Sequence, residues 1–370
     1  MTRILDKDKQ TNTTLRRKVF VAMSGGVDSS VAAALLKERG YDIVGIFMKN
    51  WSDSSFFKDK KMCPWEDDQK DARLIASKLD IPFYTFNFEK EYKERVVDYM
   101  IEGYRSGITP NPDVMCNKEI KFKLFLEKAL SLGASHIATG HYARVEKNNE
   151  KFSLLAGKDK NKDQSYFLNT LGQHELAHTI FPIGEYEKPE IRKLAKKFGF
   201  ENSEKKDSQG ICFIGDIDIF EFLKSNIPTH EGKIITMDGK VVGRHQGVEF
   251  YTIGQRHGIG SPGGGIAYYI IKKDAEKNIL YVAENGKDNE LYKKTILAKQ
   301  FIWTIGEEPG FPLTCQARIR YRQPLSDCVV SKKENGILEI KFSSQQRSVA
   351  SGQSVVFYDG DKVLGSAIII

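Results

Sequence analysis

The chain has 370 residues, of which 40% are hydrophobic and 28% are charged, a composition typical of globular proteins rather than disordered or fibrous ones. This length predicts two or three domains, because a single hydrophobic core rarely grows so large. The formal net charge of +7 is compatible with a polyanionic partner such as RNA but does not require one.

The first 17 residues are polar and mix basic with acidic side chains. They lack the apolar core of a secretory signal, and their acids argue against an organellar transit peptide. No apolar run reaches membrane-spanning length. We therefore expect a frayed tail at residues 1–17 and a cytoplasmic location.

Residues 18–215 alternate between strand-like and helix-like segments. The expected strands are 18–22, 43–48, 83–86 and 136–139, and the expected helices are 29–39, 66–79, 89–104, 117–132 and 189–198. This alternation is typical of βαβ units. It predicts an α/β domain with a doubly wound parallel sheet that is covered by helices on both faces.

After about residue 216 the pattern changes to short strands. A helix at 218–225, a hairpin at 233–243 around Asp238-Gly239, and strands at 267–272 and 279–282 predict a small central α+β domain at 216–287. Short alternating runs follow at 314–321, 328–331, 338–342, 354–358 and 363–370. They predict a C-terminal antiparallel β-barrel at 288–370.

The strongest motif is a glycine- and serine-rich turn between the first strand and the first helix, with the sequence SGGVDSS at residues 24–30. Gly25 and Gly26 permit a tight turn, and the N–H groups at a helix start favour a phosphate. No lysine-bearing GxxxxGK[ST] motif is present. Asp28 would repel phosphate unless a metal ion such as Mg²⁺ lies between them, which indicates a metal-carried pyrophosphate. The alternative is a plain turn before an ordinary helix.

Cys116 is the first of two cysteines in unusual settings. It follows a segment with two prolines, and we expect a helix to begin at or just after it. Three lysines lie within seven residues, so its pKa is predicted to be depressed. Position alone does not separate this interpretation from that of a small core residue.

Cys212 has apolar neighbours and, taken alone, is better interpreted as a buried cysteine. Glycines on both sides favour instead a segment that moves, as a sulfur-delivering arm must. We expect Cys63, Cys315 and Cys328 to be structural. The five cysteines form no CxxC pair, which argues against a zinc ribbon, and their odd number argues against a disulfide framework.

Several further runs occur in a characteristic order. They are FMKNW at 47–51, TPNPDVMCNKEIKFK at 109–123, ATGHY at 138–142, NKDQSYFL at 161–168, KKDSQGICFIG at 205–215, RYRQ at 320–323 and GQSVVFY at 352–358. Together they resemble the tRNA-specific 2-thiouridylase family, and SGGVDSS resembles the signature of the PP-loop ATP pyrophosphatases. The resemblance covers nearly the whole chain.

The resemblance implies a tRNA-uridine 2-sulfurtransferase that adenylates the C2 oxygen of the wobble uridine with ATP and Mg²⁺. Cys212 would carry a persulfide received from a sulfur-donor protein. Either its terminal sulfur or sulfide freed by Cys116 would attack C2 and expel AMP. The two cysteines would end as a disulfide until a reductant restores them.

The resemblance also implies the residues of each site. Cys116, Cys212 and Asp113 would be catalytic, with Asp113 handling a proton or orienting the base. The ATP-binding residues would be Ala22, Met23, Ser24, Gly25, Gly26, Val27, Asp28, Ser29, Met48 and Gly140, with Asp28 also a possible Mg²⁺ contact. The tRNA-binding residues would be Asn111, Pro112, Asp113, His141, Lys162, Asp163, Gln164, Arg320, Tyr321 and Gln353.

Two other functions fit parts of the sequence. Another PP-loop ligase, acting on RNA or a small molecule, would use ATP but would need neither cysteine. A nonenzymatic RNA-binding protein would bind tRNA without consuming ATP, and the intact phosphate loop argues against it. Replacing Cys116 or Cys212 by serine separates the sulfurtransferase from the ligase.

Overall fold

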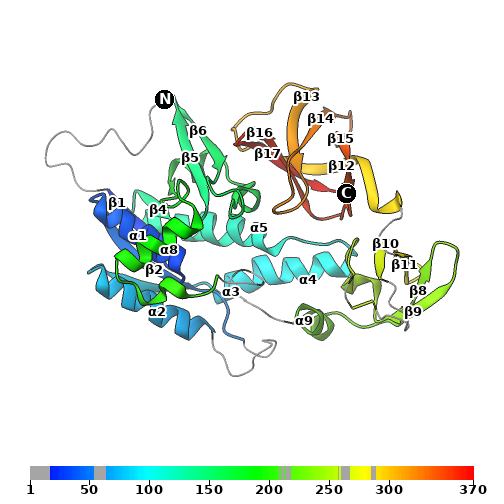
Figure 1. Ribbon diagram of the computed structural model, residues 1–370, viewed down its shortest axis with the longest axis horizontal. Coiled ribbons are helices and arrows are strands. Elements are labelled where there is room, and N and C mark those ends of the chain that lie inside the picture. The colour runs from blue at the N-terminus through cyan, green and yellow to red at the C-terminus, as the bar shows by residue number, and fades with distance from the viewer. Residues whose placement is uncertain are drawn as a thin grey trace.

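The computed structural model describes residues 17–53, 64–207, 210, 212, 218–256, 258–259, 267–284 and 289–370. The tail before residue 17, Cys63 and the domain boundaries expected near 216 and 288 lie outside the described residues. Figure 1 shows the parallel sheet with its helices on the left, the barrel at the upper right and a small mixed sheet at the lower right.

The N-terminal part is built on a parallel sheet of five strands in the order β3-β2-β1-β4-β7. The strands are β1 (Lys18–Ala22), β2 (Asp42–Lys49), β3 (Phe83–Asn87), β4 (His136–Ala138) and β7 (Thr179–Ile180). The predicted parallel sheet is confirmed. The strand order changes direction between β1 and β4, so the edge beyond their carboxyl ends is where this fold binds ligands.

Helices cover both faces of this sheet, because alternate residues of β1 enter two different cores. Val19 and Val21 face one core, and Phe20 and Ala22 face the other. The first core contains residues of α1 (Val27–Glu38), α2 (Pro64–Lys78) and α8 (Lys188–Lys197). The second contains residues of α4 (Asp98–Arg105) and α6 (Phe125–Ser131). None of the helices in the described ranges is long and apolar enough to cross a membrane.

Two long helices on the second face are interrupted by π-helical turns. One joins α3 (Glu89–Tyr92), Lys93–Val97 and α4, and the other joins α5 (Pro112–Cys116), Asn117–Leu124 and α6. The second helix begins at Pro112, with Asn111 as its N-cap. The start that we predicted at or after Cys116 is therefore wrong, and Cys116 lies in the second turn. The sequence Asn-Pro is itself a helix start signal, since proline suits the first helical position.

The central part is a mixed sheet in the order β10-β11-β8-β9. Its strands are β8 (Gly232–Thr236), β9 (Val241–His245), β10 (Tyr268–Asp274) and β11 (Ile279–Glu284), and α9 (Ile219–Asn226) precedes them. The predicted helix, hairpin and strand pair are confirmed.

The C-terminal part is a closed antiparallel barrel, as predicted. Its strands are β12 (Tyr292–Ile302), β13 (Leu313–Arg318), β14 (Ser326–Lys332), β15 (Leu338–Arg347), β16 (Ser354–Asp359) and β17 (Lys362–Ile369). The barrel closes because β12 pairs with both β15 and β17. We did not predict β12, nor the hairpin of β5 (Ala143–Asn148) and β6 (Lys151–Ala156). This hairpin leaves the N-terminal part and joins the barrel sheet, where Leu155 pairs with Lys362.

Candidate active site

The phosphate loop leads from the end of β1 into α1. Gly25 has a φ of +76°, and a Cβ atom there would collide with the backbone carbonyl of Asp68, so only glycine fits. The hydroxyl of Ser29 accepts a hydrogen bond from the Ser24 N–H at 3.1 Å. The cap residue of α1 is Gly26, so no side chain competes for the first N–H groups of the helix. This cradle suits a phosphate group.

The ends of β2 and β4 meet the phosphate loop. A Cβ atom on Gly140, just after β4, would lie 2.7 Å from the Ser29 nitrogen and 2.8 Å from the Asp28 carbonyl carbon. Met48 is buried near the end of β2, the neighbour of β1. The strands β1, β2 and β4 thus bring the residues expected to bind ATP to one edge of the sheet.

Asp28 is held by two residues that the sequence did not reveal. Lys188 Nζ lies 2.8 Å from both carboxylate oxygens of Asp28, and the Tyr142 hydroxyl donates to the same carboxylate at 2.8 Å. Burial and the nearby Asp28 raise the pKa of Tyr142, so its hydroxyl stays protonated. Both partners lie more than 100 positions away in sequence, which is why local patterns could not find them.

A metal at Asp28 would depend on the nucleotide for ligands. Across the residues that the structure describes, no three His, Cys, Asp or Glu side chains form a group that could hold a metal ion. Mg²⁺ is commonly bound by one or two carboxylates together with substrate phosphates. Asp28, beside the phosphate cradle, fits that role.

The two cysteines lie side by side. Each thiol shifts the pKa of the other, and both are free. Asp113 accepts a hydrogen bond from the Cys212 N–H at 2.9 Å, and the Tyr92 hydroxyl donates to the Cys212 carbonyl at 2.6 Å. The structure therefore brings all three predicted catalytic residues together.

The electrostatics assign the thiolate to Cys212. Its hydrogen bond from Cys116 and the ammonium of Lys121 outweigh burial and lower the pKa of Cys212 to about 7. Burial, and then the neighbouring Cys212, raise the pKa of Cys116 well above its usual value. The depressed pKa that we predicted for Cys116 is therefore wrong, because this thiol is fully buried rather than exposed at a helix start.

Lys121 supplies the positive charge of this cluster. Burial lowers the pKa of Lys121, but the two thiols and Asp113 outweigh it, so the pKa is raised and the side chain stays an ammonium. Burial raises the pKa of Asp113, and the Cys212 N–H and Lys121 offset part of that rise. A cation beside two thiols is the arrangement that a reactive thiolate requires.

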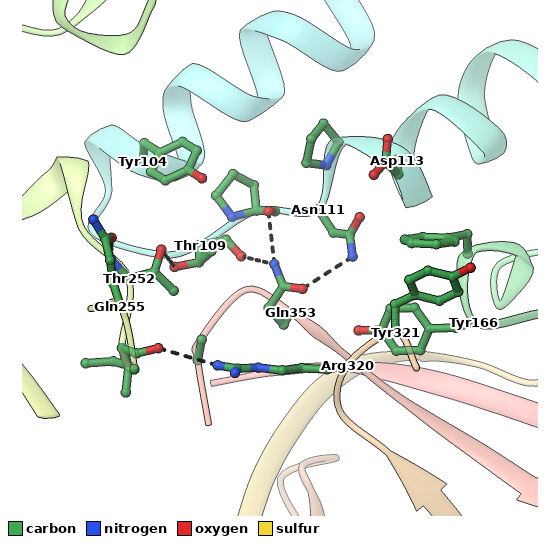
Figure 2. Close-up of a pocket in the computed structure, with 16 residues that line it drawn as sticks. Tyr104, Thr109, Asn111, Asp113, Tyr166, Thr252, Gln255, Arg320, Tyr321 and Gln353 are labelled. Atoms are coloured by element: carbon green, nitrogen blue, oxygen red, sulfur yellow. Dashed lines mark hydrogen bonds between the residues drawn. The ribbon is translucent and has the colours of Figure 1, made fainter. Parts of the chain in front are cut away.

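A cavity of about 570 Å³ opens beside Asp113 and is lined by all three parts of the chain (Figure 2). Five other residues expected to bind tRNA line it, namely Asn111, Pro112, Arg320, Tyr321 and Gln353. The Gln353 amide donates to the carbonyls of Thr109 and Pro110 at 2.9 and 3.0 Å. Its oxygen accepts from the Asn111 amide at 3.3 Å. Gln353, in the barrel part, thus fixes residues 109–111, which lead into the helix that carries Cys116.

The other residues expected to contact tRNA do not line this cavity. His141 is buried against Phe122 and Phe181, and burial lowers its pKa well below the usual value. Asp163 is buried in an ion pair with Arg318 at 2.8 Å.

Two further residues of this set have partners inside the N-terminal part. Gln164 accepts from the Tyr142 N–H at 2.9 Å, and Lys162 pairs with Asp207 at 2.5 Å. In this structure both side chains are engaged by other residues of the protein.

Comparisons with known proteins cover all three parts. The family described as the tRNA methyl transferase HUP domain matches residues 17–216, the tRNA methyl transferase PRC-barrel domain matches 220–284, and the aminomethyltransferase beta-barrel domain matches 293–369. The chain is 49% identical over 352 residues to the tRNA-specific 2-thiouridylase MnmA of Geobacillus thermodenitrificans, which covers 95% of this chain and 94% of that protein. The proteins of the same name from Halalkalibacterium halodurans and Listeria monocytogenes are 48% and 47% identical, over the same shares.

Solved structures are more distant. A 4-thiouridine synthetase in complex with RNA and with bound ATP matches 57% of this chain and 50% of its own, at 20% identity and a TM-score of 0.33. A likeness of this size supports no argument about function. The family assignment therefore rests on the relatives matched in sequence.

Proposed function

The chain belongs to the tRNA-specific 2-thiouridylase (MnmA) family, and from this premise we propose that it replaces the C2 oxygen of the wobble uridine in tRNA by sulfur, using ATP. One observation carries the chemistry: two thiols, a carboxylate and a partly buried ammonium meet beside a cavity that all three parts of the chain line. A ligase without sulfur chemistry would have no use for that cluster.

The first half of the reaction activates the base. The C2 oxygen of the uridine attacks the α-phosphorus of ATP, and pyrophosphate leaves, so that the oxygen becomes part of an AMP leaving group. The N–H groups at the start of α1, with Ser24 and Ser29, would hold the phosphates. Mg²⁺ beside Asp28 would neutralise charge on the departing pyrophosphate.

The second half delivers sulfur from a persulfide on Cys212. In one route the terminal sulfur attacks C2 and expels AMP, and the Cys116 thiolate then attacks the Cys212 sulfur and releases the 2-thiouridine. In the other, Cys116 attacks first and frees HS⁻, which attacks C2. Either route reduces the transferred sulfur by two electrons and oxidises the two cysteines to a disulfide, which a thiol reductant must reopen.

The cluster around the thiols suits both routes. Lys121 would stabilise the anionic persulfide and the thiolates that form as bonds break. Asp113 fixes the backbone at Cys212 through its hydrogen bond, and burial raises its pKa above that of an ordinary carboxyl group, which suits a group that accepts and returns a proton. Because the two thiols are close enough to shift each other's pKa, the disulfide needs no large rearrangement of the chain.

The substrates and partners follow from this scheme. A single base turned out of the anticodon would enter the cavity, where Phe167 and Tyr321 place their rings 4.6 Å apart and offer an aromatic surface for stacking. Asn111 and Asp113 present polar groups for the edge of the base. The partner beyond tRNA is a protein that donates persulfide sulfur to Cys212.

Mass spectrometry of tRNA nucleosides tests this function. Cells that lack the protein should lose 2-thiolated wobble uridine and no other modification. The purified chain, supplied with ATP, Mg²⁺ and a persulfide donor, should put sulfur-35 into unmodified tRNA and release AMP and pyrophosphate in equal amounts. Release of AMP without sulfur incorporation would favour the ligase instead.

A further inference from the structure

Tyr92 is a fully buried residue at the end of α3, and its side chain contacts the backbone of Cys212. Its hydroxyl donates to the Cys212 carbonyl at 2.6 Å, across 120 positions of sequence. Burial, and then the neighbouring thiols and Asp113, raise the pKa of Tyr92 well above its usual value. The hydroxyl therefore stays protonated and remains a hydrogen-bond donor to Cys212.

The backbone of Cys212 is held at both of its polar groups. Its carbonyl accepts from the Tyr92 hydroxyl, and its N–H donates to the Asp113 carboxylate at 2.9 Å. Tyr92 belongs to one of the two long interrupted helices of this face, and Asp113 belongs to the other. The two hydrogen bonds therefore fix the position of Cys212 relative to both helices.

The two helices share an unusual feature at this point. A π-helical turn begins directly after Tyr92, at Lys93–Val97, and another begins directly after Cys116, at Asn117–Leu124. Such turns are rare and are found frequently at functional sites. The Tyr92 ring packs edge-on against Trp51, with the ring centroids 6.5 Å apart. Packing of the ring thus sets where the hydroxyl lies, and the hydroxyl in turn holds the chain at Cys212.

We propose that Tyr92 is a positioning residue for sulfur transfer, which together with Asp113 holds the Cys212 sulfur where Cys116 can attack it. The inference rests on the proposed function, because both routes of sulfur delivery include that attack. Cys116 is completely buried within a helix, so it is not free to travel to its partner. Cys212 is only half-buried and must be brought to Cys116, and the hydrogen bonds from Tyr92 and to Asp113 do this.

Oxidised glutathione tests this attack in the full chain without tRNA or ATP. The Cys212 thiolate attacks one sulfur of the glutathione disulfide, which leaves a mixed disulfide on Cys212 and releases one reduced glutathione. The Cys116 thiolate then attacks the Cys212 sulfur, forms the Cys116–Cys212 disulfide and releases the second reduced glutathione. Glutathione stands in for the transferred sulfur in this second attack. Peptide-resolved mass spectrometry after acid quenching follows both protein species over time.

Tyr92→Phe removes the hydroxyl and keeps the ring that packs against Trp51. We expect the second attack to slow about 3- to 10-fold, which is the effect that loss of one ordinary hydrogen bond allows, so the mixed disulfide should accumulate. The adenylation half-reaction is measured separately, as pyrophosphate released in a single turnover with ATP, Mg²⁺ and unmodified tRNA but no sulfur donor. It should stay within about twofold of the unaltered chain, because the hydroxyl holds Cys212 and not the phosphate loop.

Tyr358→Phe is the matched control. Tyr358 is fully buried in β16, and its hydroxyl lies 3.2 Å from the Ser165 hydroxyl. This variant also loses a buried hydrogen bond and should lower the Tm to a similar degree as Tyr92→Phe. It should leave the second attack within about twofold of the unaltered chain, since it lies in the barrel and not beside the thiols.

An unchanged second attack in Tyr92→Phe would overturn the positioning role. Equal slowing in Tyr358→Phe would overturn it too, because the effect would then be a general loosening of the protein. An equal loss of pyrophosphate release in Tyr92→Phe would show that the residue does not act on the sulfur step in particular. The glutathione reaction needs no thiolation of tRNA, so this inference and the proposed function can fail separately.

Discussion

Among the described residues, two pairs of free thiols lie close together, and the two pairs have different surroundings. Cys116 and Cys212 come from distant segments of the N-terminal part and shift each other's pKa beside Lys121 and Asp113. Cys315 and Cys328 face each other across β13 and β14 in the barrel, with their sulfur atoms 3.7 Å apart. All four thiols are free.

The difference lies in the charges around each pair. The hydrogen bond from the Cys116 thiol and then the ammonium of Lys121 lower the pKa of Cys212 to about 7. In the barrel, the hydrogen bond from Cys328, burial and the carboxylate of Asp359 all raise the pKa of Cys315. Two adjacent thiols are therefore not a reactive site by themselves. A neighbouring cation makes one of them a nucleophile at neutral pH.

Serine replacements should distinguish the two thiol pairs most clearly. We expect Cys116→Ser and Cys212→Ser each to lower the rate of tRNA 2-thiolation by about 10³-fold or more, since neither variant can complete the sulfur transfer. Cys315→Ser and Cys328→Ser should stay within about twofold of the unaltered chain if folded. Incorporation of sulfur-35 measures all four. Equal losses in both pairs would contradict the assignment.

Lys121→Met tests whether the cation sets the reactivity. The thiolate is the reacting form, so the alkylation rate of Cys212 in the unaltered chain should rise with pH and level off above about 7. Without the ammonium the midpoint should move upward, and at pH 7 the rate should fall roughly 10- to 30-fold. Lys121→Arg keeps the charge and should retain a low midpoint. A pH profile in Lys121→Met that matches the unaltered chain would exclude this role.

Gly140→Ala tests the close contact between the end of β4 and the phosphate loop. Its Cβ atom would press on the backbone of Asp28 and Ser29, so we expect a loss of roughly 1–3 kcal/mol, seen as weaker ATP binding or a lower Tm. Gly310→Ala is the control, because nothing lies within 4 Å of the atom that it adds. Calorimetry and thermal unfolding measure the two variants. Equal ATP affinity and equal Tm in the two variants would show that the end of β4 does not pack closely against the phosphate loop.

The smallest effect that we expect is the loss of stability on replacing Cys328 in the barrel. Cys328→Ser places a hydroxyl among buried apolar side chains, and we expect it to cost about 1–2 kcal/mol of unfolding free energy. Cys328→Ala removes the sulfur without adding a polar group, so comparing the two isolates the cost of the hydroxyl. Urea denaturation measures both. A faster thiolation rate in either variant would argue for a role that the buried pair does not suggest.

Local patterns in the sequence were enough for much of the fold. The turn at Gly25 and Gly26 lies directly between a strand and a helix, and the alternation of elements up to residue 215 predicts the parallel sheet. The hairpin at Asp238-Gly239 has its own turn signal. Each of these features is specified by residues close together in the chain.

Long-range contacts could not be predicted in the same way. Cys212 reaches Asp113 across 99 positions and Lys188 reaches Asp28 across 160, and no period or turn signal encodes such a contact. The pKa of Cys116 was predicted in the wrong direction because its burial depends on the surrounding core. Strand β12 and the β5–β6 hairpin were not predicted either.

The β5–β6 hairpin makes the barrel and the N-terminal part share one sheet. The carbonyl of Asp361 accepts from the Ala156 N–H at 2.7 Å, and its carboxylate pairs with Arg144 at 2.7 Å and Lys160 at 2.6 Å. Cutting the chain before the barrel would leave β6 as an unprotected edge, prone to aggregation. A truncated enzyme that keeps every catalytic residue should therefore be poorly behaved in solution. Insertions and fusions are better placed at the exposed turn around Gly239.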